Sequence, residues 1–469
     1  MALLRMRTAL TAMMMVSATA LEGCGDESEP DSEVGVSREA TSAGTATFPA
    51  SFARQWMVNL QNSVKGDKIS PPVAARTYAY GGIAMWEAVV HGIPGGHSLA
   101  GQLNGLNALP VPTPGLEYDW PTVLAQTMSR VTGVRPGPGG LPAQAGSYVY
   151  PERVFFEFTT ASQASLTALG PQQIGYRRVA GVPASTIDNS IAYGNQLADA
   201  LIAWSESDGY PEARYKGFIP PSGPDKWVPT GFSDTDKVAN PVEPGFGTLR
   251  PLFLTAPDEC APPPPVAFST APSSDFYAQA NAAYQTDKNL TDQQIESARF
   301  WADPPGATST PAGHWMALVT KYTRAGNLAD AARAYALSGA VDYDAFIAVW
   351  ESKYEYNLLR PETYIRRHID PDWSPLIPTP PFAAYVSGHS GVSGANAVVL
   401  TELFGNGPVI DNTKLRRGFG TFTFDNFTDA ANEAADSRLY GGIHYPMDNS
   451  AGLALGACVG EALLERVDI

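Results

Sequence analysis

Two basic residues seven positions apart are the first candidates for chemistry in this chain. Lys353 and Arg360 stand in the segment Lys-Tyr-Glu-Tyr-Asn-Leu-Leu-Arg-Pro. A helix through this segment would complete about two turns, and would place both cations on one face roughly 10 Å apart along the axis. Pro361 would end that helix or start a bend. Two such cations can clamp one anion, although a solvated surface pair explains this spacing equally simply when it is taken alone.

A Ser-Gly-His tripeptide lies at the start of a predicted helix over residues 388–404. Ser387 suits the N-cap, and Gly388 lets the backbone approach a ligand closely. The free N–H groups and the dipole of a helix N-terminus favour an anion. His389 could then serve as a general acid or base. By itself, the tripeptide also fits an ordinary capped helix with an exposed histidine.

A third set of reactive side chains follows near the C-terminal helix. Two adjacent glycines between Arg438 and His444 permit a sharp change of direction, so these two side chains can converge. Pro446 suits the first position of the last helix, which puts His444 at another helix N-terminus. Asp448, four residues on, can reach back to the ring of His444 and fix which nitrogen faces the site. A polar loop without function is the alternative.

Together the three elements read K-x6-R-P, S-G-H and S-R-x5-H-x3-D over roughly residues 350–450. This order resembles the signature shared by vanadium-dependent haloperoxidases and the type 2 phosphatidic acid phosphatase superfamily. The resemblance implies an all-helical bundle with an oxyanion-binding active site. The superfamily usually has proline before Ser-Gly-His, whereas this chain has Val386. We expect that difference to alter the stiffness of the loop more than its chemistry.

For a haloperoxidase, the resemblance implies a role for each reactive side chain. His444 would be the metal ligand, and His389 would deprotonate hydrogen peroxide. The oxygens of vanadate would be held by five residues that donate hydrogen bonds or positive charge: Lys353, Arg360, Ser387, Gly388 and Arg438. Lys353 would also polarise the bound oxidant toward attack by halide, which gives hypohalous acid. Vanadium would act as a Lewis acid without changing its oxidation state.

Two other functions remain open at this point. In an acid phosphatase of the same superfamily, His444 would attack phosphorus and His389 would protonate the leaving oxygen. A non-catalytic oxyanion-binding lipoprotein would hold phosphate or vanadate without turnover.

Aromatic residues beside the motifs favour the peroxidase. Trp350 lies three residues before Lys353, and Phe382 lies five before Ser387, which resembles fungal chloroperoxidases, where aromatics adjoin the halide site. An aromatic wall would desolvate a halide, although both residues could simply be core. Many lipid phosphatases of the superfamily are embedded in membrane, whereas this chain has no apolar stretch long enough to span one after its N-terminal signal. We therefore favour a haloperoxidase that uses hydrogen peroxide and halide, with the halide and any organic acceptor left open.

A segment upstream extends the resemblance. The run from Arg299 to Asp303, followed by Thr-Pro-Ala-Gly-His-Trp, resembles a stretch of vanadium haloperoxidases in which the matching aspartate pairs with the arginine corresponding to Arg438. Asp303 is thus a candidate to orient that guanidinium. For His314 we favour a helix-capping or packed histidine over a site residue.

The chain around the motifs is mostly helical by its periodicity, with an all-α fold of one or two packed helical bundles. The predicted helices cover residues 51–65, 71–91, 121–132, 185–206, 292–302, two or three helices within 313–368, 388–404 and 447–466. Long Pro/Gly-rich connections are expected at 134–152, 209–270 and 370–381. We assign residues 48–290 to an N-terminal bundle with long loops and 291–469 to a catalytic bundle.

Composition and the N-terminus indicate an exported protein. The 469 residues carry a net charge of -16, which argues against a nucleic-acid partner. Residues 1–23 resemble a signal peptide, and the Leu-Glu-Gly-Cys that ends at Cys24 resembles a bacterial lipobox. Residues 24–47 would then be a lipid-attached tether, the protein's one link to a membrane in the cell envelope. Cys260 and Cys458 could pair, but the apolar surroundings predicted for Cys458 favour a buried thiol.

Overall fold

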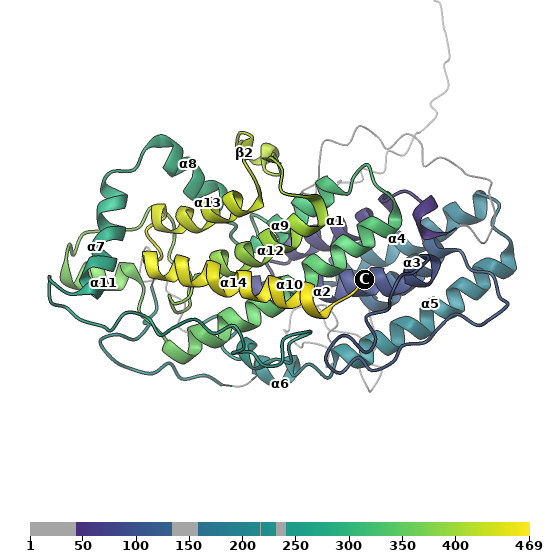
Figure 1. Cartoon of the computed structure of the whole chain (residues 1–469), viewed down its shortest axis with the longest axis horizontal. Helices are drawn as coiled ribbons and strands as arrows, with labels where there is room; N and C mark the ends of the chain where they lie inside the picture. The colour runs from purple at the N-terminus through teal and green to yellow at the C-terminus, as the bar shows by residue number, and fades with distance from the viewer. Residues whose placement is uncertain (1–43, 134–157, 216, 231–240) are drawn as a thin grey trace, which may run out of the picture.

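The computed structural model describes residues 44–133, 158–215, 217–230 and 241–469. The predicted signal peptide, Cys24, most of the tether and the 134–152 connection lie outside these residues. Fourteen α-helices and one two-stranded antiparallel sheet make up the described part, which confirms the all-α prediction (Figure 1). None of the helices described here is both long enough and apolar enough to cross a bilayer.

The helices and strands have these bounds: α1 Ser51–Gly66, α2 Pro71–Val89, α3 Trp120–Thr132, α4 Thr160–Val179, α5 Ala184–Ser205, α6 Tyr210–Tyr215, α7 Asp275–Lys288, α8 Asp292–Phe300, α9 Thr310–Tyr322, α10 Leu328–Tyr356, α11 Pro361–His368, α12 Gly388–Phe404, β1 Val409–Asp411, β2 Phe422–Phe424, α13 Phe427–Tyr440 and α14 Pro446–Arg466. The helices α3, α4 and α5 gather at one end of the molecule, and α7, α8 and α11 gather at the other (Figure 1).

Each segment predicted to be helical from its periodicity contains a helix, but four helices were missed. Two of them, α6 and α7, are short or carry few large apolar residues. The helix α4 has Pro171 in its interior, and a proline there predicts a break. The helix α13 buries mainly alanines, whose small side chains produce a weak periodic signal. The omission of α13 matters most, because Arg438 belongs to its last turn.

The longest helix, α10, joins the N-terminal and C-terminal parts of the chain. It is buried over most of its length and packs against α2, α9, α12 and α14. Glycines allow α10 and α2 to approach closely: a Cβ on Gly82 would lie 2.2 Å from the carbonyl oxygen of Tyr335. A Cβ on Gly339 would lie 2.6 Å from the carbonyl oxygen of Tyr78. The residues assigned to two bundles therefore pack directly on each other through this pair.

A second close crossing, between α12 and α14, positions the reactive residues. A Cβ on Gly456 would lie 2.0 Å from the carbonyl oxygen of Gly391, and one on Gly452 would lie 2.8 Å from that of Ser387. Only glycine permits this approach without a shift of backbone. The crossing brings the N-terminus of α12, with the Ser-Gly-His tripeptide, beside the N-terminus of α14, which follows His444.

Cys260 and Cys458 form a disulfide, so the buried thiol favoured for Cys458 was wrong. Cys458 lies on a half-buried face of α14, where it meets Cys260 from a loop distant in the sequence. Arg466 and Glu259 form an ion pair at the same contact between loop and helix.

Candidate active site

Lys353 and Arg360 reach the site from different elements, which corrects the single helix expected through both. The helix α10 ends at Tyr356, and Asn357 adopts the left-handed conformation with φ 47°. Asparagine tolerates this conformation better than most residues, so it ends helices much as glycine does. Arg360 then precedes α11, where Pro361 takes the first helical position.

The segment 382–386 brings these two cations together. The ammonium of Lys353 donates to the carbonyl oxygens of Ala383, Ala384 and Val386 at 2.9, 2.9 and 2.5 Å. The Nε of Arg360 donates to the carbonyl oxygen of Phe382 at 2.8 Å. Val386, which stands where the superfamily usually has proline, follows a cis peptide bond. The loop before Ser-Gly-His thus holds both cations through its backbone.

Arg360 has one donor group without a partner in the described part of the chain. Its Nη1 donates to the carbonyl oxygen of Ile443 and lies 2.9 Å from Nε2 of His444. Its Nη2 is buried and has no hydrogen-bond partner among the residues that the structure describes. Burial lowers the pKa of Arg360 to about 10. Burial and the neighbouring Arg360 also lower the pKa of Lys353 well below its usual value. A bound anion would raise the pKa of both groups, because a nearby negative charge stabilises their protonated, charged forms.

His444 is held by Asp448, as the spacing predicted. The Nδ1 of His444 lies 2.8 Å from Oδ2 of Asp448, which also accepts the backbone N–H of Tyr445 at 3.1 Å. Burial, and then the nearby cations, lower the pKa of His444 well below its usual value, so the ring is neutral. Burial raises the pKa of Asp448 to about 7, against a weaker lowering by hydrogen bonding and the cations. Because Nδ1 donates to Asp448, the lone pair of Nε2 faces Arg360 and the site.

Ser387 is the N-cap of α12, also as predicted. Its hydroxyl oxygen accepts hydrogen bonds from the backbone N–H and the hydroxyl of Ser390, at 3.3 and 2.8 Å. The hydroxyl proton of Ser387 therefore remains able to donate to a ligand. Gly388 and His389 are the first two helical residues, so their N–H groups have no partner within the helix.

His389 and Arg438 face each other across the site. The Nη1 of Arg438 lies 3.4 Å from Nε2 of His389, and its Nη2 donates to the carbonyl oxygen of Ala298 at 3.2 Å. Burial, followed by the charge of Arg438, lowers the pKa of His389 well below its usual value. A neutral imidazole can accept a proton, which is the property a general base needs. Burial also lowers the pKa of Arg438 to about 10.

The predicted aromatic flank lies against the cations. The rings of Trp350 and Phe382 are 5.1 Å apart between centroids. The ammonium of Lys353 lies 5.2 Å from the Phe382 ring centre, and the guanidinium of Arg360 lies 5.0 Å from it. This wall excludes water from one side of both cations, which strengthens their attraction for an anion.

The structure corrects the partner expected for Asp303. Its carboxylate pairs with Lys414 at 2.7 Å and with Nδ1 of His314 at 3.0 Å, instead of pairing directly with Arg438. The negative charge of Asp303 still acts on Arg438. Burial lowers the pKa of the Arg438 guanidinium, and this charge partly offsets that effect. His314 is a packed histidine, as expected, but it is ion-paired on both nitrogens. Lys414 and its neighbour Asp411 were missed, because they lie in a short segment without periodicity or motif.

The set of buried cations fits an oxyanion. Lys353, Arg360 and Arg438 are at most 1% exposed, and in the described part of the chain none of the three forms an ion pair with a carboxylate. Buried charge without a counter-charge is costly, so three such cations around the Nε2 of His444 favour binding of a multiply charged anion. The unpartnered Nη2 of Arg360 supplies a free donor for one of its oxygens.

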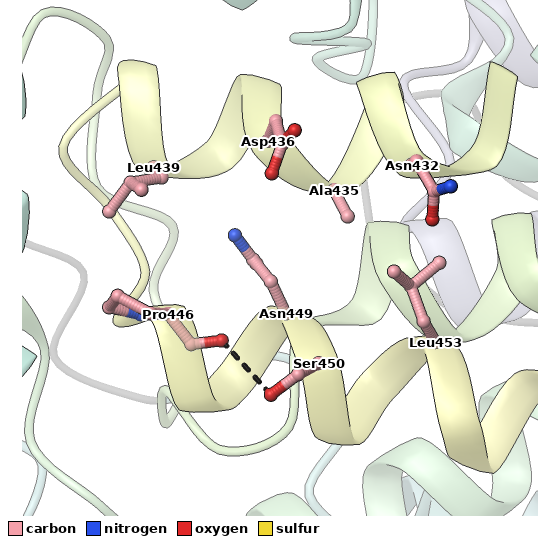
Figure 2. Close-up of a pocket in the computed structure, with 8 residues that line it drawn as sticks. All are labelled: Asn432, Ala435, Asp436, Leu439, Pro446, Asn449, Ser450 and Leu453. Atoms are coloured by element: carbon pink, nitrogen blue, oxygen red, sulfur yellow. Dashed lines mark hydrogen bonds between the residues drawn. The ribbon is translucent and has the colours of Figure 1, made fainter. Parts of the chain in front are cut away.

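A further pocket is lined by eight residues, Asn449 among them (Figure 2). It lies between α13 and α14, and the side chain of Asn449 points into it. The amide oxygen of Asn449 also lies 3.4 Å from the hydroxyl of Ser390, which in turn contacts Ser387. One polar chain of three side chains thus connects this pocket with the Ser-Gly-His turn.

The fold is a helical bundle with a cluster of buried cations, and comparison with known proteins identifies the family. Residues 333–468 match the model of the VCPO second helical-bundle domain. The vanadium chloroperoxidase of Curvularia inaequalis is 26% identical over 253 residues, which span 44% of this chain and 42% of that protein. The crystal structure of the first bacterial vanadium-dependent iodoperoxidase superposes with a TM-score of 0.77 at 31% identity, over 89% of this chain and 96% of the other. The chain belongs to the vanadium-dependent haloperoxidase family.

More distant structures share the fold. The holo form of a bacterial vanadium-dependent chloroperoxidase superposes with a TM-score of 0.59 at 14% identity, over 85% of this chain and 92% of the other. An apo-form structure of a bacterial vanadium-dependent chloroperoxidase superposes with a TM-score of 0.58 at 14% identity, over 85% of this chain and 94% of the other.

Proposed function

We propose that the chain is a vanadium-dependent haloperoxidase, which oxidises halide with hydrogen peroxide to hypohalous acid and water. The observation that carries this proposal is the cluster of three buried cations, without carboxylate partners in the described residues, around the neutral Nε2 of His444. When bound, vanadate supplies Lewis-acid chemistry that activates hydrogen peroxide toward halide. Iodide is the first halide to test, because the relative at 31% identity is an iodoperoxidase.

The site residues divide into holding and proton-transfer roles. His444 would hold the metal through Nε2, because Asp448 occupies Nδ1. Arg360, Arg438 and Lys353 would neutralise the negative charge on the vanadate oxygens. Lys353 would then replace some of its three hydrogen bonds to backbone carbonyls with hydrogen bonds to the anion. The hydroxyl of Ser387 and the N–H of Gly388 would donate to the remaining oxygens. These contacts would orient the anion before any proton moves.

His389 would accept the proton of hydrogen peroxide. Its lowered pKa keeps the ring neutral, and its partial exposure leaves it open to an entering small molecule. Trp350 and Phe382 would form the apolar wall against which a halide loses water.

An acid phosphatase is the second candidate, because the same geometry suits an in-line attack by Nε2 of His444 on phosphorus. The discriminating experiment compares two preparations of the purified protein. One preparation is loaded with orthovanadate and assayed for triiodide formation and for bromination of a dione with hydrogen peroxide. The other is kept free of vanadate and assayed for hydrolysis of an aryl phosphate. Halide oxidation without hydrolysis supports the proposal, and hydrolysis without halide oxidation supports the phosphatase.

Three variants assign the roles within the site. His444→Ala should abolish retention of vanadate through gel filtration. His389→Ala should retain vanadate but slow halide oxidation by roughly 10²–10⁴-fold. His97→Ala is the matched control, since His97 is exposed and pairs with Asp468 far from the site. Full halide oxidation in the His444→Ala variant would overturn the proposal. Tight vanadate binding by the wild type without any turnover would leave a pure oxyanion-binding protein.

We also propose that the protein is exported and carries a lipid on Cys24. The disulfide between Cys260 and Cys458 supports export, because such bonds persist in oxidising compartments. Partition of the wild type into detergent, compared with the variant Cys24→Ser, tests the anchor. Equal partition of the two proteins into the aqueous phase would rule the lipid out.

A further inference from the structure

The end of α8 and the turn after it receive hydrogen bonds from two site residues. Arg438 donates to the carbonyl oxygen of Ala298 at 3.2 Å, and hydrogen bonding to the backbone of Trp301 raises the pKa of His389. This segment, the last three residues of α8 with the turn after them, runs from Ala298 to Asp303, and below it is called the 298–303 turn. Its backbone carbonyls thus fix where the general base and one oxyanion-binding cation point.

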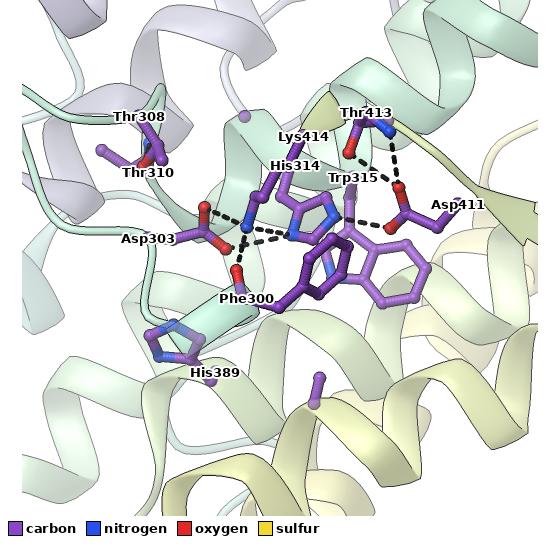
Figure 3. A network of polar contacts seen from close by, with 12 residues as sticks. Phe300, Asp303, Thr308, Thr310, His314, Trp315, His389, Asp411, Thr413 and Lys414 are labelled. Carbon is purple, nitrogen blue, oxygen red and sulfur yellow. Dashed lines mark hydrogen bonds and ion pairs between the residues drawn. The ribbon is translucent and has the colours of Figure 1, made fainter. Parts of the chain in front are cut away.

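Four buried charged residues hold the 298–303 turn from its other side (Figure 3). We call them the buried quartet, and they are Asp303, His314, Asp411 and Lys414. The Nζ of Lys414 pairs with Asp303 at 2.7 Å and donates to the carbonyl oxygen of Phe300. His314 bridges the two carboxylates, with Nδ1 at 3.0 Å from Asp303 and Nε2 at 2.7 Å from Asp411. Each member of the quartet is at most 5% exposed.

Two members of the quartet belong to the β1–β2 hairpin, which spans residues 409–424. Asp411 ends strand β1, and Lys414 follows it by three residues. The hairpin also packs on the turn with aromatic side chains, because the rings of Phe422 and Phe300 stack at 4.1 Å. The hairpin is therefore attached to the 298–303 turn both by charge and by apolar contact.

Backbone conformation shows that the turn is held under constraint. Asp303 has a φ of 46°, in the left-handed region, which non-glycine residues occupy at some cost in free energy. Such a conformation persists where surrounding contacts fix it, and here the fixing contacts are the ion pairs of Asp303 with Lys414 and His314.

The quartet also reaches His389 through its charge. Burial and Arg438 lower the pKa of His389, Asp303 raises it, and Lys414 lowers it again. Figure 3 shows the His389 ring on one side of the 298–303 turn and Lys414 with His314 on the other.

We propose that Lys414, supported by His314 and Asp411, is a positioning residue of the active site, which fixes the 298–303 turn and thereby the His389 ring and the Arg438 guanidinium. The hairpin 409–424 then belongs to the machinery of the site, although none of its residues touches the anion. The inference deepens the proposed function and rests on it for the reaction that the positioned groups serve.

The test uses the full chain and two readouts that need no turnover. Isothermal titration with inorganic phosphate measures the oxyanion site. The ring ¹⁵N and ¹H resonances of His389, assigned among the six histidines by comparison with a His389→Gln variant, report its hydrogen bonding. Lys414→Met removes the ion pair with Asp303 and keeps a side chain of similar length. We expect it to weaken phosphate binding by roughly 10–100-fold, as loss of a group that orients ligands does, and to move the His389 resonances. Lys414→Arg should restore both.

Lys321→Met is the matched control. Lys321 holds the same hairpin, through the carbonyl of Ile410 and the side chain of Asn412, at the strand instead of at the turn. It should lower stability without moving the His389 resonances or the phosphate affinity. If Lys414→Met fails to fold, the nearly isosteric Asp411→Asn takes its place, with changes in the same direction.

The outcomes separate this inference from the proposed function. A folded Lys414→Met or Asp411→Asn protein with the His389 resonances and phosphate affinity of wild type would overturn the positioning role. If the wild type oxidises no halide, yet Lys414→Met still moves the His389 resonances and Lys321→Met does not, the positioning role stands and the haloperoxidase proposal fails.

Discussion

Replacement of Asp448 by asparagine removes one negative charge from the buried pair that it forms with His444. The Oδ2 of Asp448 accepts from Nδ1 of His444 at 2.8 Å and from the N–H of Tyr445 at 3.1 Å. An asparagine oxygen can accept both hydrogen bonds, so Asp448→Asn loses charge while the tautomer is kept. Asp448→Ala loses the charge and both bonds. Groups that orient a metal-ligating histidine contribute about 10–100-fold to metal affinity. We expect vanadate affinity to fall about tenfold in the asparagine variant and about a hundredfold in the alanine variant. These losses correspond to about 1.4 and 2.7 kcal/mol of binding free energy.

The assay is isothermal titration of each purified variant with orthovanadate, after thermal unfolding has shown that it is folded. Asp429→Asn is the matched control, because Asp429 occupies the same position in the first turn of α13 and caps that helix with Asn426. We expect the control to bind vanadate as the wild type does. If a folded Asp448→Ala protein binds vanadate with an affinity within about twofold of that of the wild type, the ring of His444 is oriented by something other than Asp448. That result would refute the reasoning.

Three further predictions concern stability. Burial and the neighbouring Lys414 lower the pKa of His314, but its two carboxylate partners outweigh them, so the net pKa is raised. The protonated ring therefore stabilises the fold fully below about pH 6.5. This stabilisation is lost as the pH rises through the raised pKa of the folded protein. In urea unfolding, the free-energy gap between wild type and His314→Gln should therefore be larger at pH 6 than at pH 9, and an equal gap would contradict the ion pairs. Reduction of the Cys260–Cys458 disulfide, which spans 198 residues, should lower the free energy of unfolding by about 2–5 kcal/mol, measured against a Cys260→Ser/Cys458→Ser protein that reductant leaves unchanged. Gly456→Ala would place a Cβ 2.0 Å from a carbonyl oxygen of α12 and should cost about 1–3 kcal/mol, whereas Gly175→Ala, with open space around it, should be neutral or stabilising.

The positions of most helices could be predicted from the sequence, because apolar spacing and capping residues are local signals. Thr291 and Gln294 form a capping box at the start of α8, and Ser387 caps α12 as predicted. The helices that were missed lack such signals, as with the alanine face of α13 and the interior proline of α4. The expected helix through Lys353 and Arg360 was wrong for a local reason as well, because Asn357 adopts the left-handed conformation and ends α10.

The candidate site residues could be selected from the sequence, since Lys353, Ser387, His389 and His444 stand in short motifs whose spacing is set by local geometry. What joins the motifs was decided by tertiary structure. The α12–α14 crossing depends on glycines that no periodic pattern singles out, and it brings Ser387 beside His444. The pairing of Asp303 with Lys414, across more than a hundred residues, and the disulfide of Cys260 depend on loop contacts. Local preferences of the backbone carry no information about which distant loop a buried charge will meet, so these contacts emerge only when the helices have packed.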